Sequence, residues 1–202
     1  MPKRIYLIRH GETDWNAARR WQGFAPTGLN DAGREQARAL AAFLRACPIH
    51  TVYSSDLPRA LETARIVGAA LGVVPQVDAR WREINVGVFQ GLTADEVELL
   101  YPAELAAWRA DMPDYRVPTG ESRRELQDRA AAAWTQVAAG DGDGETVVVS
   151  HGGTIRLLLC RLFGSQVRDS HPLPNTSITT LVRAADSNWR LERVGETPHL
   201  SE

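Results

Sequence analysis

Cysteine is scarce in this chain of 202 residues, and long apolar runs are missing from it. Its two cysteines, Cys47 and Cys160, lie far apart in apolar helical stretches, so we expect reduced core residues rather than a disulfide framework. The opening stretch MPKRIYLIRH holds only four consecutive apolar residues, too few for a signal peptide or a membrane span. We therefore expect a cytoplasmic protein with no membrane partner.

An excess of charge of one sign is also missing. The 23 lysine and arginine residues nearly balance the 25 acidic ones, giving a net charge of −2, so the global basic field that attracts nucleic acid is absent. The five histidines form no HExxH motif and pair with no cysteine at a metal-ligand spacing. We expect no metal, no other cofactor and no nucleic-acid partner.

Short β-rich runs alternate with helical periodicity along the chain. The runs RIYLIR, HTVYSS, GETVVVS, SITTLVR and WRLERV have the composition of strands. Residues 30–47, 57–72, 121–139 and 153–164 repeat apolar side chains at helical spacing. Such alternation predicts an α/β fold, a three-layer α/β/α sandwich with a mostly parallel sheet.

We expect one domain over residues 1–202. The rhythm is broken between about 84 and 119, where proline signals surround helical segments, and this region predicts a small helical insertion near residues 92–119 that could act as a lid. Residues 195–202 are expected to form a loose tail.

Cationic residues, histidines and glycines follow three of the predicted strands. They are Arg9, His10 and Gly11 after the first strand, Arg59 in the helix after the second, and His151, Gly152 and Gly153 after the third, GETVVVS. Ligands of open α/β sheets bind at the carboxyl ends of strands, where guanidinium groups and helix amino termini suit an oxyanion. Taken alone, Arg59 could be a surface charge paired with Glu62, and HGG could be a tight turn. The convergence favours a phosphate or other anion site.

Four stretches resemble one known family. LIRHGETDWN, SSDLPRALETA, REINVGVFQGLT and VVVSHGGTIR are similar to the motifs of the histidine phosphatase superfamily, also called phosphoglycerate mutase-like, in the family's order from residue 4 to about 160. The resemblance implies that His10 is a nucleophile forming a phosphohistidine, while Arg9, Arg59 and a protonated His151 clamp the phosphoryl group.

The resemblance also implies the remaining site residues. Glu83 matches the family's general acid, which protonates the leaving alkoxide and later activates water. Further phosphate contacts are implied at Asn16, Gln22 and Gly23, with a hydroxyl from Thr13 and an amide from Gly152. Glu12 is expected to orient the arginines.

The family contains mutases, phosphatases and non-catalytic binding modules. Ile84, Asn85 and Val86 stand where the mutases tend to carry basic and aromatic residues, the HGG of residues 151–153 replaces their HGN, and the insertion is short. These features favour the small phosphatase branch, hence a metal-independent hydrolase of small-molecule phosphomonoesters. Phosphoglycerate mutase-type transfer and a regulatory phosphate-binding module are the alternatives, and a homodimer is compatible with the family. Six aromatics could line an apolar lid or form a core beneath the insertion: Trp21, Phe24, Phe89, Tyr101, Trp108 and Tyr115.

Overall fold

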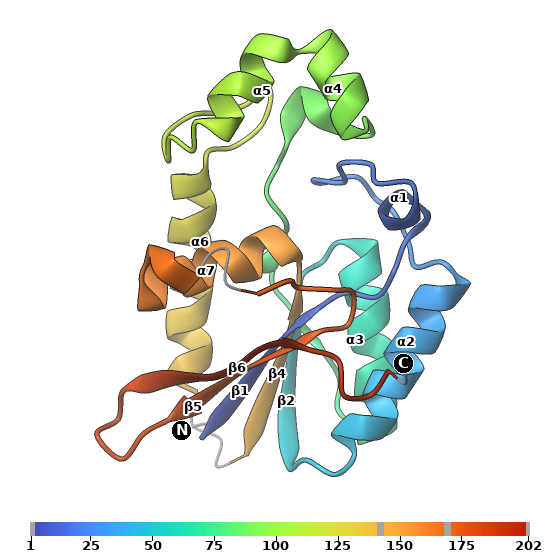
Figure 1. Cartoon of the computed structure of the whole chain (residues 1–202). Helices are drawn as coiled ribbons and strands as arrows, with labels where there is room; N and C mark the ends of the chain where they lie inside the picture. The colour runs from blue at the N-terminus through green and yellow to red at the C-terminus, as the bar shows by residue number, and fades with distance from the viewer. Residues whose placement is uncertain (1–2, 141–143, 168–170, 201–202) are drawn as a thin grey trace.

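A sheet with the strand order β3-β2-β4-β1-β5-β6 runs through the molecule, which a computed structural model describes over residues 3–140, 144–167 and 171–200 (Figure 1). Strands β1 to β4 pair in parallel, while β5 is antiparallel to both β1 and β6. The strands are β1 (Arg4–Arg9), β2 (Ile49–Ser54), β3 (Gln76–Val77), β4 (Glu145–Ser150), β5 (Ile178–Arg183) and β6 (Trp189–Glu196).

The predicted mostly parallel sheet and three-layer sandwich are confirmed. Helices α2 and α3 cover one face of the sheet, and α6 and α7 cover the other (Figure 1). They are α2 (Asp31–Leu44), α3 (Pro58–Leu71), α6 (Arg123–Ala138) and α7 (Gly152–Phe163). The short β3 was not predicted, because two exposed residues carry no periodicity.

Strand β1 shows how the sequence builds two apolar layers. Because side chains alternate along a strand, Ile5 and Leu7 face the layer of α6 and α7, while Tyr6 and Ile8 face α2 and α3. Each fully buried aliphatic side chain of this kind contributes about 1.5–3 kcal/mol to stability.

Capping residues set where the covering helices begin. The Asn30 side chain accepts a hydrogen bond of 2.8 Å from the Gly33 amide at the start of α2. Ser122 and Glu125 form a reciprocal capping box at the start of α6. Pro58 occupies the first turn of α3, where a missing amide hydrogen costs nothing.

The predicted helical insertion is confirmed as a pair of short helices, α4 (Ala94–Leu100) and α5 (Pro102–Arg109). Figure 1 shows them together at one end of the molecule, beyond the ends of α6 and α7. Their core includes Phe89, Val97 and Leu105, which pack with residues of α6 and α7. The single-turn elements are α1 (Asp14–Ala17), η1 (Ala79–Trp81), η2 (Gly87–Phe89) and η3 (Ser165–Val167).

The expectation of a loose tail is wrong for residues 195–200. Gly195 and Glu196 belong to β6. His199 lies with its Nε2 atom 2.9 Å from the Thr176 hydroxyl and its ring 6.2 Å from that of Phe43. A polar contact with Thr176 and an aromatic contact with Phe43 therefore hold this segment against the rest of the protein. Residues 201–202 lie outside the described part of the chain.

Cys47 and Cys160, both within the described residues, are thiols, as expected. Each is intermediate in exposure rather than fully buried, and Cys47 packs against the core on the α2–α3 face of the sheet. Among the described residues, no helix combines the length and the apolar character needed to cross a bilayer.

Candidate active site

His10 follows β1 directly and is almost fully buried. Its Nδ1 lies 2.7 Å from the Gly11 carbonyl oxygen, which can only accept, so Nδ1 carries the proton and donates. The Nε2 lone pair is therefore unprotonated and accepts a 3.2 Å hydrogen bond from Arg59 Nε. The backbone thus fixes the tautomer in which Nε2 is a nucleophile.

Burial lowers the pKa of His10 well below its usual 6.5, and the charges of Arg59 and Arg9 lower it further. The imidazole is consequently neutral at neutral pH. The Gly11 backbone lies close against the start of α2, because a Cβ on Gly11 would lie 2.5 Å from the Gly33 carbonyl oxygen.

Arg59, in the first turn of α3, is fully buried beside His10. Its Nη2 donates to the Gly23 carbonyl at 2.8 Å and its Nη1 to the Ala25 carbonyl at 3.0 Å. Burial lowers its pKa to about 10, which still leaves it protonated at neutral pH. The alternative of a surface pair with Glu62 is wrong, since Glu62 instead accepts from Arg34.

Arg9, the last residue of β1, supplies a second guanidinium group, which is only partly buried. Its Nη1 donates to the Leu173 carbonyl at 2.6 Å, and its Nε is buried without a hydrogen-bond acceptor among the described residues. Burial lowers the pKa of Arg9, an effect that the nearby Glu83 carboxylate opposes. Gly152 lies against this side chain, because a Cβ there would be 3.6 Å from Arg9 Nε.

The Glu83 carboxylate rests on the amino terminus of α7. Its Oε2 accepts from the Gly153 amide at 3.1 Å, and its Oε1 accepts from the Ile84 amide at 2.8 Å. A Cβ on Gly153 would lie 2.4 Å from Glu83 Oε1, so a side chain at this position would displace the Glu83 carboxylate from its present place.

Arg129, in the middle of α6, fixes the backbone that carries Glu83. Its guanidinium group donates to the carbonyls of Arg82 at 2.6 Å and Glu83 at 2.7 Å, and it also pairs with Glu121. Sequence analysis missed this residue, because an arginine in an amphipathic helix ordinarily points to solvent.

We expect Arg129→Met to lower the free energy of unfolding by about 3 kcal/mol, because it leaves buried carbonyls and the Glu121 carboxylate without their donor. Urea unfolding followed by circular dichroism measures this change. Arg124→Met on the same helix, which breaks the exposed pair with Asp114, is the control and should cost under about 1 kcal/mol. Equal losses in the two variants would contradict the role of Arg129.

His151 follows β4 and lies against His10, with ring centroids 5.1 Å apart. Its Nε2 is 2.9 Å from the Ser55 hydroxyl, and its buried Nδ1 has no partner among the described residues. Burial lowers the pKa of His151 well below 6.5, and the charge of Arg59 lowers it further. In this arrangement of groups the imidazole of His151 is therefore favoured in its neutral form, and a protonated His151 beside a bound phosphoryl group stays a prediction.

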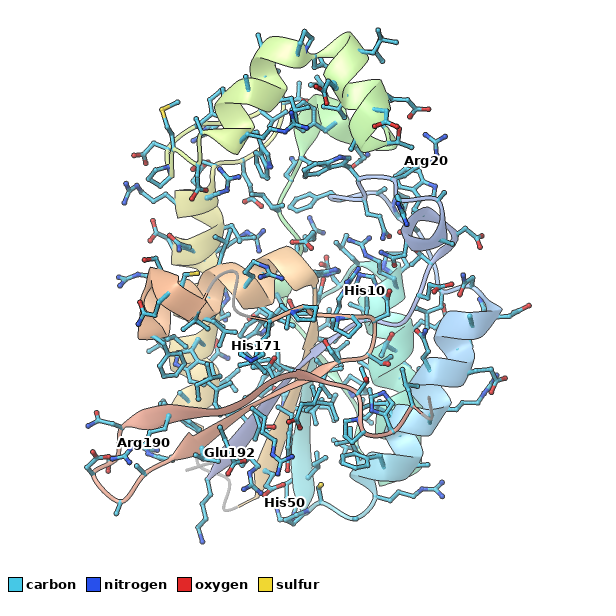
Figure 2. All side chains as sticks on the ribbon, in the orientation of Figure 1. His10, Arg20, His50, His171, Arg190 and Glu192 are labelled. Atoms are coloured by element: carbon cyan, nitrogen blue, oxygen red, sulfur yellow. The ribbon has the colours of Figure 1, made fainter. Side chains whose placement is uncertain are left out.

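A cavity of about 350 Å³ opens beside His10. Figure 2 shows His10 near one end of the sheet and Arg20 beside α1, toward the α4–α5 pair. Of the residues expected at the site, the cavity is lined by Arg9, His10, Asn16, Gln22, Gly23, Arg59 and Glu83.

Three residues expected to contact the phosphoryl group do not line this cavity, namely Thr13, His151 and Gly152. The Thr13 hydroxyl is fully buried and instead bonds to Asn16 and Gln22 at 3.1 Å each, so it positions these two amides. Gly152 packs against Arg9, and its neighbour Gly153 lines the cavity.

The outer wall of the cavity contains residues that the sequence could not place at the site, among them two aromatic side chains. Trp21 and Trp108 line it, with their rings edge to face at 5.7 Å, so two of the six aromatics considered above reach the cavity. Phe89, Tyr101 and Tyr115 belong to the core beneath the insertion, and Phe24 lies under the Arg82 guanidinium. The other lining residues are Arg19, Arg20, Ile84, Val86 and Gly153.

Glu12 does not orient the arginines as expected. Its Oε1 accepts a hydrogen bond of 2.9 Å from the Asn30 side chain, which ties the loop after β1 to the start of α2. The described residues contain no group of three histidine, cysteine or acidic side chains placed to hold a metal ion.

The fold thus gathers Arg9, His10, Arg59 and His151 beside the carboxyl ends of β1, β2 and β4. A family model of the histidine phosphatase superfamily (branch 1) matches residues 5–197, and the chain belongs to this superfamily. It is 38% identical to phosphoglycerate mutase-like protein 4 of Arabidopsis thaliana over 201 residues, 98% of this chain and 87% of the relative.

Two solved structures of mycobacterial proteins are similar in fold. One, titled mycobacterial hydrolase 1, has a TM-score of 0.87 and 32% identity, covering 96% of this chain and 99% of that one. The other is a glucosyl-3-phosphoglycerate phosphatase in complex with VO3, with a TM-score of 0.84 and 34% identity, covering 96% of this chain and 98% of that one.

Proposed function

We propose that this protein is a metal-independent phosphomonoesterase that works through a phosphohistidine on His10. The observation that carries the proposal is the neutral, tautomer-fixed His10, whose Nε2 faces the buried Arg59 at the base of a cavity also lined by Arg9 and Glu83. The similarity to the hydrolase and phosphatase structures supports it.

The first step transfers the phosphoryl group to the enzyme. His10 Nε2 attacks phosphorus, and the bond from phosphorus to the ester oxygen breaks. Arg9 and Arg59 neutralise charge on the phosphoryl oxygens, as positioning and electrostatics dominate this chemistry. Glu83 gives its proton to the departing oxygen, so the leaving group departs as an alcohol.

The second step returns the enzyme to its starting state. Glu83, now a carboxylate, accepts a proton from water as the water oxygen attacks phosphorus. The bond from phosphorus to His10 Nε2 breaks, and inorganic phosphate leaves with His10 neutral again. His151, whose ring lies against that of His10 and whose buried Nδ1 has no partner among the described residues, is assigned a further hydrogen bond to a phosphoryl oxygen.

Hydrolysis is favoured over transfer back to substrate by the apolar part of the cavity wall. Ile84 and Val86 line the cavity at positions where the mutases of the family tend to carry basic and aromatic residues. Phosphoglycerate mutase-type transfer is the second candidate, and the similarity to the mutase-like Arabidopsis protein favours it.

We expect phosphate release from several phosphomonoesters to be unchanged in EDTA, because guanidinium groups supply the positive charge in this mechanism. A panel that includes p-nitrophenyl phosphate and 3-phosphoglycerate, assayed with and without EDTA, tests this expectation. Activity that disappears on chelation and returns with a divalent ion would refute metal independence. Conversion of 3-phosphoglycerate to 2-phosphoglycerate without phosphate release would establish the mutase instead.

A further inference from the structure

The side-chain amide of Gln22 lines the cavity beside His10, and its oxygen is engaged by two hydroxyl groups. Gln22 Oε1 lies 2.7 Å from the Thr27 hydroxyl and 3.1 Å from the Thr13 hydroxyl. The NH2 group of the same amide has no hydrogen-bond acceptor among the described residues. Because the oxygen and the nitrogen of an amide project in different directions from one carbon, this arrangement leaves the NH2 group to donate to a bound anion.

The hydroxyl of Thr27 decides which end of the Gln22 amide faces it. A hydroxyl group can donate or accept, so its contact with an amide is compatible with either orientation until a third group is considered. Here the third group is Arg59, whose Nη1 can only donate and lies 3.2 Å from the Thr27 hydroxyl oxygen. The hydroxyl hydrogen of Thr27 is therefore left for Gln22, its one acceptor among the described residues. A reversed amide would turn an N–H group toward this hydrogen.

Thr13 does not decide the orientation of Gln22. Its hydroxyl accepts from the backbone amide of Asn16 at 3.1 Å, and its single hydrogen can go to Asn16 Oδ1 or to Gln22 Oε1. Asn16, the other amide of the cavity wall, is fixed without a hydroxyl, because its Oδ1 also accepts from the Thr13 backbone amide at 3.2 Å. Gln22 therefore depends on Thr27 for its orientation, whereas Asn16 does not.

We propose that Thr27 is a positioning residue, which accepts from Arg59 and donates to Gln22 and so holds the Gln22 NH2 group toward the phosphoryl group. This inference rests on the proposed function. Thr27 does not line the cavity, so it acts through Gln22 rather than on the substrate. A reversed amide would present its oxygen to the phosphoryl oxygens, and two acceptors facing each other weaken binding.

The test measures the dissociation constant of inorganic phosphate by calorimetry, which needs no turnover. Thr27→Val keeps the shape of the side chain and removes the hydroxyl. We expect this constant to rise about five- to twentyfold, because a hydrogen bond to a charged group is lost whenever the Gln22 amide reverses. Thr27→Ser retains the hydroxyl and should stay within about twofold of the unaltered protein.

A double-mutant cycle with Gln22→Ala separates positioning from a structural effect. In the Gln22→Ala background, Thr27→Val should change the dissociation constant less than about twofold, because no amide is left to orient. An equal loss in both backgrounds would mean that Thr27 acts through Arg59 or the fold, and it would overturn the inference. Thr27→Ala repeats the cycle with a smaller side chain if Thr27→Val does not fold.

Thr135→Val is the matched control, because the hydroxyl of this exposed residue bonds to the Ala131 carbonyl of its own helix. It should leave phosphate binding unchanged. Ester hydrolysis together with phosphate binding that is the same in Thr27→Val and the unaltered protein would overturn this inference and leave the proposed function standing. The expected cycle without phosphate release from any ester would overturn the phosphomonoesterase and leave Thr27 as a positioning residue of an anion site.

Discussion

His10→Ala is expected to abolish phosphate release, with a loss in kcat on the order of ten thousandfold or more. No other group within the described cavity wall combines a neutral imidazole with a lone pair directed at a buried arginine, so no substitute nucleophile is at hand. The measurement is phosphate release from p-nitrophenyl phosphate by His10→Ala and by the unaltered protein, with the melting temperature of each measured alongside.

The same variant tests the covalent intermediate. Rapid quenching in alkali after mixing with a radiolabelled ester should trap label on the unaltered protein, and acid should then release it, because a phosphorus–nitrogen bond is acid-labile. His50→Ala, at an exposed histidine in β2, should keep both the label and the activity. Figure 2 shows His50 at the other end of the sheet from His10. Label that persists in His10→Ala would place the nucleophile elsewhere.

Glu83→Gln is expected to slow hydrolysis of alkyl phosphates by about a hundred- to ten-thousandfold. Aryl phosphates with good leaving groups should lose far less, because a nitrophenolate departs without being protonated. Glutamine preserves the shape of the side chain and can still accept from the Gly153 or Ile84 amide, so the fold should persist.

The slope of log kcat/KM against the leaving-group pKa measures this effect across a series of esters. It should be steeper for the variant than for the unaltered protein. Glu98→Gln, at an exposed pair with Arg109 on the insertion, serves as the control. Parallel slopes for Glu83→Gln and the unaltered protein would remove Glu83 as the proton donor.

The sequence was most informative where one residue's position follows from a regular element. Arg9, His10 and His151 could be placed because parallel strands end at a common edge, and Arg59 because it begins the helix after β2.

Positions that depend on contacts across the chain could not be predicted in this way. The placement of Glu83 depends on Arg129, 46 residues further on, and on the absence of a side chain at Gly153. The hydroxyl of Thr13 was expected to contact the substrate phosphate. A threonine three residues before an asparagine is also typical of a helix cap, and in the structure Thr13 caps α1. The sequence did not reveal Arg19 as a lining residue of the cavity, because its backbone is left-handed and no periodicity of side chains predicts such a conformation.

The contact between Gly11 and Gly33 has a consequence for how the protein tolerates variation. The acceptor that fixes the His10 tautomer is a main-chain carbonyl, so no replacement of a side chain removes it directly. It moves only if the path of the chain moves, and that path is set by two glycines on separate elements. A methyl group at position 33, in the first turn of α2, would therefore impair the chemistry of the site by shifting this backbone. It would do so although position 33 touches neither the reacting phosphorus nor the nucleophile.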